Sequence, residues 1–574
     1  MSRWKVDPFL LLIIVAGLAI LGFKLRIAKP IDWIGGTDEA VLAEAADSFA
    51  RGKGLSNDFI QYSYFYSPLQ YPQITQPEAH YPHLYSLLIV PFYLLLGKTA
   101  LAAKLPAMLV ASILLPIFLY LLVTQLSTSR LTGLAAGLCV MVFPEIFEHS
   151  LIPDDDGIFH CVLIASCFFI IRAIDNSNYF YPAGILIGLS YYAKGNALIL
   201  IPVYGLFCLI RGGAKILGNP KLWHCLVIIL LIMTPWFIRN TVHFGSPTFS
   251  TQQYAAGYIG YQGWEEGTYS LYWDQERPTL IDKFRQAGFP EVWKKSTGFL
   301  LTYLWWSFID IDELWDEFEA KDFLTYYTGI PAAIGLFIFL LANLYFLCRH
   351  LFFKDTKYDQ SSFIYRIGIL LKPWYQPNFH LLWLVSTTCL VFLAVCWEPI
   401  ERLAYPFIVI NMALGWTTFH LLVSQTLARS RWSHHTSSIT SCLIVVLMLP
   451  ILLKSWGAVY DDYKDGRFPY GEKRISWMRT GKWIKENLPN SITMFREPAQ
   501  LHFYSEEKTI QVPLADLNQI ITVMKYYGVT HIIPKRNMRP ALKPLVEGKI
   551  PGFKLIYDQG LEIYQIDYNL LPDD

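Results

Sequence analysis

The chain has 574 residues, of which 53% are hydrophobic and only 16% are charged, and its mean hydropathy is +0.33. So apolar a composition excludes an ordinary soluble globular protein, because the excess apolar surface must face lipid. The net charge of +1 lacks the excess of basic residues that is typical of nucleic-acid-binding proteins. The cysteines form no C-x-x-C motif, which argues against structural zinc.

Apolar runs long enough to cross about 30 Å of hydrocarbon recur along the chain, each closed by charged or Pro/Gly-rich residues. They predict about eleven membrane-spanning helices. The predicted spans are Phe9–Leu25, Leu101–Leu126, Leu131–Phe147, Gly157–Ile174, Tyr181–Tyr192, Asn196–Ile210, Leu222–Ile238, Thr328–Leu347, Leu381–Trp397, Leu403–Leu427 and Ile439–Trp456. The fold class is therefore a polytopic α-helical membrane protein.

Lysine and arginine in the short loops predict the orientation, because basic residues are retained on the cytoplasmic side. With the N-terminus in the cytoplasm, each predicted inner loop carries basic residues, from Arg3 and Lys5 to Arg429 and Arg431. The exceptions are Lys24, Arg26 and Lys29, which fall at the outer end of the first span. This threading predicts a multi-pass protein of the bacterial plasma (inner) membrane with its C-terminal part outside.

The predicted membrane domain covers residues 1–457 and has two large outer-face loops, 26–99 and 240–326. In the first loop, Val41, Leu42, Ala45 and Phe49 share one side of a helix that would lie on the membrane surface, with Thr37 as its N-cap. Leu84–Gly97 is apolar but short and contains a proline, so we expect it to lie in the outer interface.

Residues 458–574 form a second predicted unit, in which hydropathy falls and short strands alternate with helices. The predicted elements are Ile475–Glu486, Ile492–Phe495, Thr509–Val512, Leu517–Tyr527, His531–Pro534 and Leu555–Gln565. This alternation predicts a small soluble α/β domain. It contains no G-x-G-x-x-G, Walker A or G-x-S-x-G motif that would indicate nucleotide binding or hydrolysis.

Carboxylates gather in the predicted outer loops close to the membrane. Asp38 and Glu39 follow a Gly35–Gly36 pair, and Asp154, Asp155 and Asp156 precede the fourth span. Any one such acid would more often be solvated or cap a helix. Several carboxylates at the same depth relative to the membrane could deprotonate an acceptor hydroxyl or hold a divalent cation.

Two basic residues are predicted to lie at the same depth as these carboxylates, close to the outer surface of the membrane. Lys194 separates two apolar segments and Arg402 precedes the tenth span. Either side chain could extend to the interface, or it could bind the phosphate of a lipid-linked substrate.

Short motifs in this order resemble the glycosyltransferase C superfamily, and most closely its protein mannosyltransferase and aminoarabinose transferase branch. The motifs are Gly36-Thr37-Asp38-Glu39, Tyr81-Pro82-His83, Pro153-Asp154-Asp155-Asp156, Gly188 to Lys194, Glu401 to Pro406, and Trp483 to Pro489. The resemblance covers most of the chain. It departs from many relatives in its triple aspartate and in His83, where relatives often have a second proline.

The resemblance implies an inverting transfer of a sugar from a polyprenyl phosphate to an acceptor on the outer face of the membrane. It implies that Asp38 is the catalytic base, that Glu39 supports it, and that one of Asp154 to Asp156 orients the acceptor or donor. Lys194 and Arg402 would bind the lipid phosphate, while the role of His83 is open. No cofactor is required, although Asp154 and Asp156 could hold Mg²⁺ or Mn²⁺.

The predicted partners are the polyprenyl-phosphate sugar, a lipid, glycan or protein acceptor, and membrane lipids. Two other functions remain open from the sequence. A lipid or sugar transporter would place its charged residues near the membrane midplane in broken helices. A non-catalytic envelope scaffold would need its C-terminal domain but not Asp38.

Overall fold

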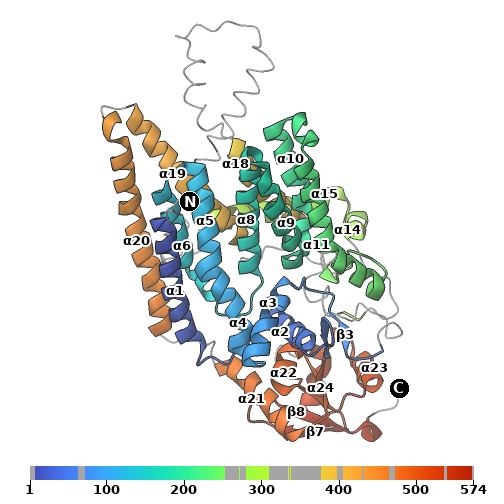
Figure 1. The fold of residues 1–574 in the computed structure, drawn as a ribbon. Helices are drawn as coiled ribbons and strands as arrows, with labels where there is room; N and C mark the ends of the chain where they lie inside the picture. Colours follow the sequence, from blue (N-terminus) through green and yellow to red (C-terminus); the bar gives the residue numbers. More distant parts are fainter. Residues whose placement is uncertain are drawn as a thin grey trace.

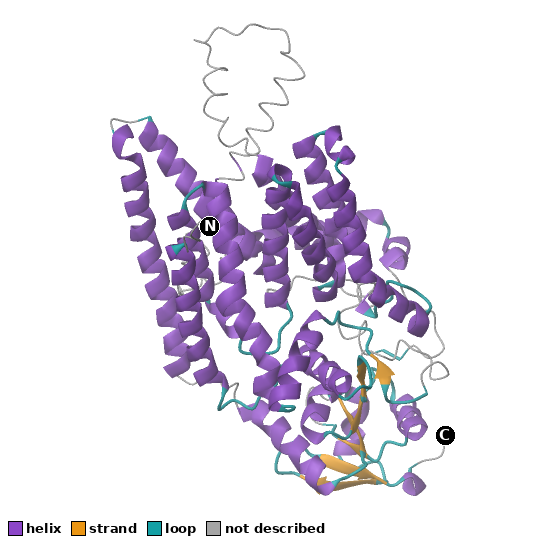
Figure 2. Ribbon diagram, viewed as in Figure 1, coloured by secondary structure: helices purple, strands orange, loops and turns teal. Residues whose placement is uncertain are grey.

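A computed structural model describes residues 7–61, 72–252, 270–271, 280–308, 334, 337, 377–396, 405–429, 432–464, 472–534 and 539–571. Long helices run side by side through one part of the molecule, and an α/β domain lies beyond one end of them (Figure 1). The strands are confined to that end (Figure 2).

The helices of the bundle follow the predicted spans closely. Their bounds are α1 Pro8–Ala28, α4 Ala100–Leu109, α5 Leu115–Ser127, α6 Arg130–Met141, α7 Pro144–His149, α8 Asp156–Asp175, α9 Phe180–Ala193, α10 Leu200–Gly212, α11 Pro220–Phe244, α18 Pro377–Cys396, α19 Tyr405–Ala428 and α20 Thr436–Lys464. A π-helical turn, Val110–Leu114, joins α4 to α5.

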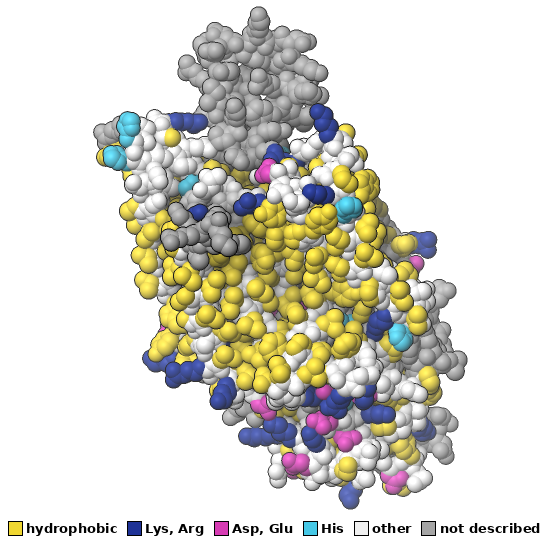
Figure 3. Space-filling view, viewed as in Figure 1, with side chains coloured by type: hydrophobic (Ala, Val, Ile, Leu, Met, Phe, Trp, Pro, Cys, Tyr) yellow, Lys and Arg dark blue, Asp and Glu magenta, His cyan; other side chains and the backbone are white. Residues whose placement is uncertain are grey.

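Within the described residues, eight helical segments are long and apolar enough to cross a membrane. Of the predicted span at Thr328–Leu347, the structure describes residues 334 and 337 alone. Figure 3 shows the corresponding apolar band over the helices, with charged side chains gathered at its edges and over the α/β domain. The helical membrane fold is therefore confirmed.

One predicted span is wrong in its bounds. Leu131–Phe147 was expected to be continuous, but α6 ends at Met141 and the short helix α7 begins at Pro144. A proline in the first turn of a helix has no amide hydrogen to donate back, so it starts a new helix at little cost. Helix α7 then leads to the triple aspartate.

Two helices in the second large loop lie beside the bundle. They are α14, Leu280–Ala287, and α15, Phe289–Phe308. Phe299 and Leu300 of α15 pack against a cluster that contains Leu390 of α18 and Phe407 of α19. This part of the loop therefore packs against the side of the bundle.

The C-terminal part is an α/β domain, as predicted. Its helices are α21 Glu472–Asn487, α22 Pro498–Ser505, α23 Leu517–Tyr527 and α24 Lys543–Val546, and its strands are β4 Ile492–Phe495, β5 Lys508–Gln511, β6 His531–Ile532, β7 Phe553–Tyr557 and β8 Ile563–Ile566. The stretch expected at Leu555–Gln565 is the antiparallel pair β7 and β8. Helix α22 was not predicted.

The sheet of this domain takes a strand from the first loop. Strand β2, Phe59–Ile60, pairs in parallel with β5, and the strand order is β2-β5-β4-β6-β8-β7. Two further short strands of the first loop, β1 Ser56–Asn57 and β3 Gln76–Pro77, pair with each other. The first loop and the C-terminal domain therefore share one sheet.

Helix α2, Thr37–Ala50, is not the surface helix that the sequence suggested. Ten of its 14 residues are buried, including Glu44 and Asp47, because α3 (Leu84–Leu96) packs against one side of it and α22 against another. The N-cap is Gly36, and Thr37 is the first helical residue. On its polar face, Glu44 pairs with His502 of the C-terminal domain.

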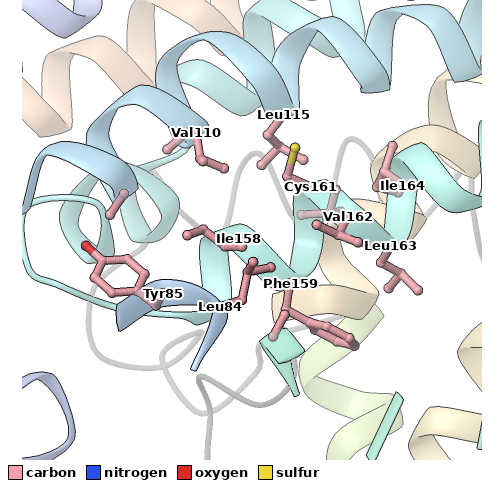
Figure 4. Close-up of a cluster of buried hydrophobic side chains, with 14 of the residues drawn as sticks. Leu84, Tyr85, Val110, Leu115, Ile158, Phe159, Cys161, Val162, Leu163 and Ile164 are labelled. Atoms are coloured by element: carbon pink, nitrogen blue, oxygen red, sulfur yellow. The ribbon is translucent and has the colours of Figure 1, made fainter. Parts of the chain in front are cut away.

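Beside α2, the bundle core holds the start of α8 in place. Leu84 and Tyr85 of α3 lie near Ile158 and Phe159 of α8, and Val110 of the π-turn completes this cluster (Figure 4). The hydroxyl of Tyr85 donates a hydrogen bond of 2.8 Å to the carbonyl oxygen of Ala103 in α4. Close packing of this kind fixes the acidic N-terminal end of α8 relative to α2.

Candidate active site

A cavity of about 500 Å³ lies between the helix ends and the first loop. Its polar lining combines Asp38 and Glu39 of α2, the triple aspartate before and at the start of α8, and Lys194 at the end of α9. Its apolar lining includes Phe159, Trp236, Phe392, Leu393 and Phe407. Residues that are up to about 370 positions apart in the sequence thus converge on one space.

Asp38 stands in the first turn of α2 and is partly accessible, while Glu39 is buried. The turn before them depends on glycine. Gly35 has φ +114°, and a Cβ there would lie 2.9 Å from the Cβ and Cγ of Glu39. A side chain at Gly35 would therefore be strained by the backbone and would also collide with Glu39.

The triple aspartate is buried at the junction of α7 and α8. Carboxylate oxygens of Asp154, Asp155 and Asp156 all lie within 4.8 Å of one another. Asp154 accepts a hydrogen bond of 2.9 Å from the amide of Asp156, and its other oxygen lies 2.8 Å from Nδ1 of His149. Asp154 therefore shapes the turn and also pairs with a histidine.

Lys194 is the cation that faces these acids. Its Nζ lies 2.6 Å from Oδ1 of Asp155 and 2.8 Å from Oδ1 of Asp156. Burial alone would lower the pKa of Lys194, but the carboxylates of Asp155, Asp156 and Asp154 raise it, so the ammonium stays charged. Its predicted role as a phosphate ligand stays a prediction, and two carboxylates hold its ammonium group.

Among the described residues of the cavity, the acids outnumber the cations. Burial raises the pKa of Asp155, the neighbouring acids raise it further, and Lys194 opposes them. Oδ2 of Asp155 is buried and has no hydrogen-bond partner within the described part of the chain. Three clustered carboxylates with an unsatisfied oxygen suit a divalent cation, so Asp154, Asp155 and Asp156 are the residues that would hold one.

Sequence reasoning missed His80, which also lines the cavity. Its Nδ1 lies 2.7 Å from Oγ1 of Thr251, and Ser250 and Gln252 line the cavity beside it. Burial lowers the pKa of His80 to about 4, although the charge of Asp38 opposes that shift, so His80 is neutral at pH 7. In the sequence, His80 directly precedes the Tyr81-Pro82-His83 motif, but no pattern of its own identifies it.

One predicted site residue, His83, is not among the described residues that line the cavity. His83 is fully buried at the start of α3 and packs edge-on against Trp236, with 4.9 Å between ring centroids. Burial holds the pKa of His83 well below its usual range. Arg402 lies outside the described residues.

His149 gives a testable pH dependence. Burial would lower its pKa, but the hydrogen bond to Asp154 and the nearby carboxylates raise it to about 9. A raised pKa in the folded state means that the stabilisation is fully present below the unfolded value of about 6.5 and is lost as the pH rises through 9. We therefore expect His149→Gln to lower the melting temperature of the purified protein clearly at pH 6 and hardly at all at pH 10. A difference that is constant over this range would contradict the charged pair.

Comparisons with known proteins bear on this arrangement. Residues 80–238 match the sequence profile of the dolichyl-phosphate-mannose-protein mannosyltransferase family. The structure resembles ArnT from Cupriavidus metallidurans bound to undecaprenyl phosphate, with a TM-score of 0.56, 13% identity, and coverage of 99% of this chain and 100% of that one. Part of this chain is thus similar to the mannosyltransferase family, and the chain as a whole shares the fold of ArnT.

The apo form of ArnT from the same organism gives a similar result, with a TM-score of 0.55, 12% identity, and coverage of 98% of this chain and 99% of that one. No curated protein matches the sequence significantly. The segment that matches the mannosyltransferase family contains the triple aspartate and Lys194, whereas Asp38 precedes it. The family match agrees with the superfamily that the sequence motifs suggested, and the likeness to ArnT confirms the predicted helical fold with a C-terminal α/β domain.

Proposed function

We propose that this protein is a membrane glycosyltransferase that moves a sugar from a polyprenyl-phosphate donor to an acceptor hydroxyl, with inversion at the anomeric carbon. The observation that carries the proposal is the single cavity in which Asp38, the triple aspartate and Lys194 meet an apolar wall. Phe392, Leu393 and Phe407 suit a lipid chain, and the polar end suits the sugar and its phosphate. The undecaprenyl phosphate bound by ArnT supports this class of donor.

In the proposed reaction, the carboxylate of Asp38 takes the proton from the acceptor hydroxyl. The acceptor oxygen then bonds to the anomeric carbon while the bond from that carbon to the phosphate oxygen breaks. The electron pair of that bond leaves with the polyprenyl phosphate. Glu39 is buried, lines the same cavity next to Asp38, and supports the base. A divalent cation on Asp154 to Asp156 would supply charge neutralisation for the leaving phosphate.

The place of the charged groups favours this function over transport. Asp38 is in the first turn of α2, Asp155 is the N-cap of α8, and Lys194 is the C-cap of α9. All of them lie at helix ends that face the α/β domain (Figure 1). A transporter site near the midplane of the bundle would instead interrupt its spanning helices.

The test of the function is transfer by the purified protein in nanodiscs. A set of polyprenyl-phosphate sugars is supplied with envelope lipids, glycans or proteins as acceptors, and the products are identified by mass spectrometry. We expect one sugar to appear on one acceptor class, with release of polyprenyl phosphate. Absence of transfer with every donor, together with unchanged glycolipids and glycoproteins in cells lacking the protein, would reject the proposal.

We further propose that the cavity and the α/β domain face the outside of a bacterial inner membrane. Ser433, between α19 and α20, lies at the end of the bundle remote from that domain, and Lys525 of α23 is exposed on the domain itself. With Cys348 and Cys442 replaced by serine, Lys525→Cys should react with an impermeant thiol reagent in intact spheroplasts, and Ser433→Cys should not. The reverse pattern would place the site in the cytoplasm.

A further inference from the structure

Helix α22 of the C-terminal domain contacts the segment that leads into Asp38. The amide of Ile34 donates a buried hydrogen bond of 2.9 Å to the hydroxyl of Tyr504. That hydroxyl donates in turn to the carbonyl oxygen of Asp32, at 3.0 Å. Nε2 of Gln500, one helical turn earlier, donates to the carbonyl oxygen of Gly35 at 3.1 Å.

These contacts hold the backbone ahead of the Gly35–Gly36 turn and at its first residue. Gly35 and Gly36 have no side chains, and Gly36 provides no side-chain hydrogen bond as the N-cap of α2. Paired glycines leave a chain more freedom than any other residues, and that freedom must be restricted by outside contacts. Tyr504 and Gln500 are 94% and 97% buried, so water does not compete with them.

Further contacts make the arrangement rigid. The ring of Trp33 stacks on Tyr504, with 6.4 Å between centroids, and it also packs against Trp477 of α21. Later in α2, Oε2 of Glu44 lies 3.2 Å from Nε2 of His502. Helix α22 is thus fixed to α2 both ahead of Asp38 and beyond it.

We propose that Tyr504 and Gln500 are positioning residues for the catalytic base, so that the C-terminal domain completes an active site to which it gives no lining side chain in the described residues. This inference rests on the proposed function of Asp38. The hydrogen bonds of α22 set the path of residues 32–36, and this path sets where the carboxylate of Asp38 meets the acceptor hydroxyl. A base that is displaced by about 1 Å loses on the order of a hundredfold in rate.

The decisive variant is Tyr504→Phe, which keeps the stacked ring and removes both hydrogen bonds to the segment. We expect kcat to fall about ten- to a hundredfold while KM for the donor stays within about twofold. Gln500→Met keeps the side-chain volume and removes the hydrogen-bond donor to Gly35, so it should also lower kcat. The matched control is Tyr568→Phe, because Tyr568 also donates to a backbone carbonyl, that of Val529 at 2.6 Å, but away from this segment.

Two measurements separate positioning from general damage. Hydrogen exchange of the peptide that contains Ile34 should be about tenfold faster in Tyr504→Phe and unchanged in Tyr568→Phe. In an Asp38→Asn background, Tyr504→Phe should cause no further loss of rate, because the group that it positions is already removed.

The outcomes are distinct. If the wild type does not transfer sugar, or if Asp38→Asn leaves transfer unaffected, the proposed function fails and this inference fails with it. If Asp38→Asn abolishes transfer but Tyr504→Phe and Gln500→Met behave like Tyr568→Phe, the positioning role alone is overturned. An additive loss in the double variant would also overturn it.

Discussion

Asp38→Asn should lower the rate of transfer about a hundred- to ten-thousandfold, because a positioned general base typically contributes that much. The substitution keeps the size and hydrogen-bonding geometry of the side chain and removes only its ability to take a proton. Donor binding should persist, since Asp38 is placed to meet the acceptor. The measurement is single-turnover transfer with purified protein, donor and acceptor, beside a binding assay for the donor.

The control for this variant is Asp47→Asn on the same helix. Asp47 pairs with Arg51 and Lys98 and is not among the cavity residues, so its loss affects α2 without affecting the site. Glu39→Gln should reduce the rate less than Asp38→Asn, because Glu39 is proposed to support the base and does not itself take the proton. Near-normal transfer by Asp38→Asn would make Asp38 an ordinary first-turn acid and would remove the catalytic assignment.

The sequence predicted those features that one segment determines by itself. Apolar runs of membrane-spanning length defined most of the bundle, and local patterns located β4 and α23 within a residue or two. The acids and Lys194 were identified as candidates because charged residues are unusual so near to apolar spans. Their meeting in one cavity agrees with that interpretation.

The features that were missed depend on contacts between distant segments. Strand β2 has two residues and no pattern of its own, and it exists because β5 lies beside it. Every residue of α22 is buried, so it has no polar face to reveal helical periodicity. The burial of α2 and the pairing of Lys194 with Asp155, 39 residues away, likewise arise only when the chain is folded.

Replacing Lys194 should have the second large effect, because its ammonium balances the charge of the buried aspartates. Lys194→Ala would leave Asp155 and Asp156 buried beside each other without their ammonium, and breaking a buried ion pair in this way typically costs about 3–5 kcal/mol. We therefore expect the variant to melt at a much lower temperature or to fail to accumulate. Loss of transfer in that variant alone would not distinguish a phosphate ligand from a structural counter-ion.

The double variant Lys194→Met with Asp155→Asn makes that distinction. It removes one positive and one negative charge together, so the melting temperature should recover most of what Lys194→Ala loses. We expect transfer to stay low, with the apparent affinity for the donor about ten- to a hundredfold weaker, because a phosphate deprived of its cation loses charge-assisted hydrogen bonds. Asp155→Asn alone is the control, since it keeps the ammonium and frees it from one of its two acids. If the double variant regains both stability and donor affinity, Lys194 serves only to neutralise the aspartates, and the phosphate must be bound by another cation.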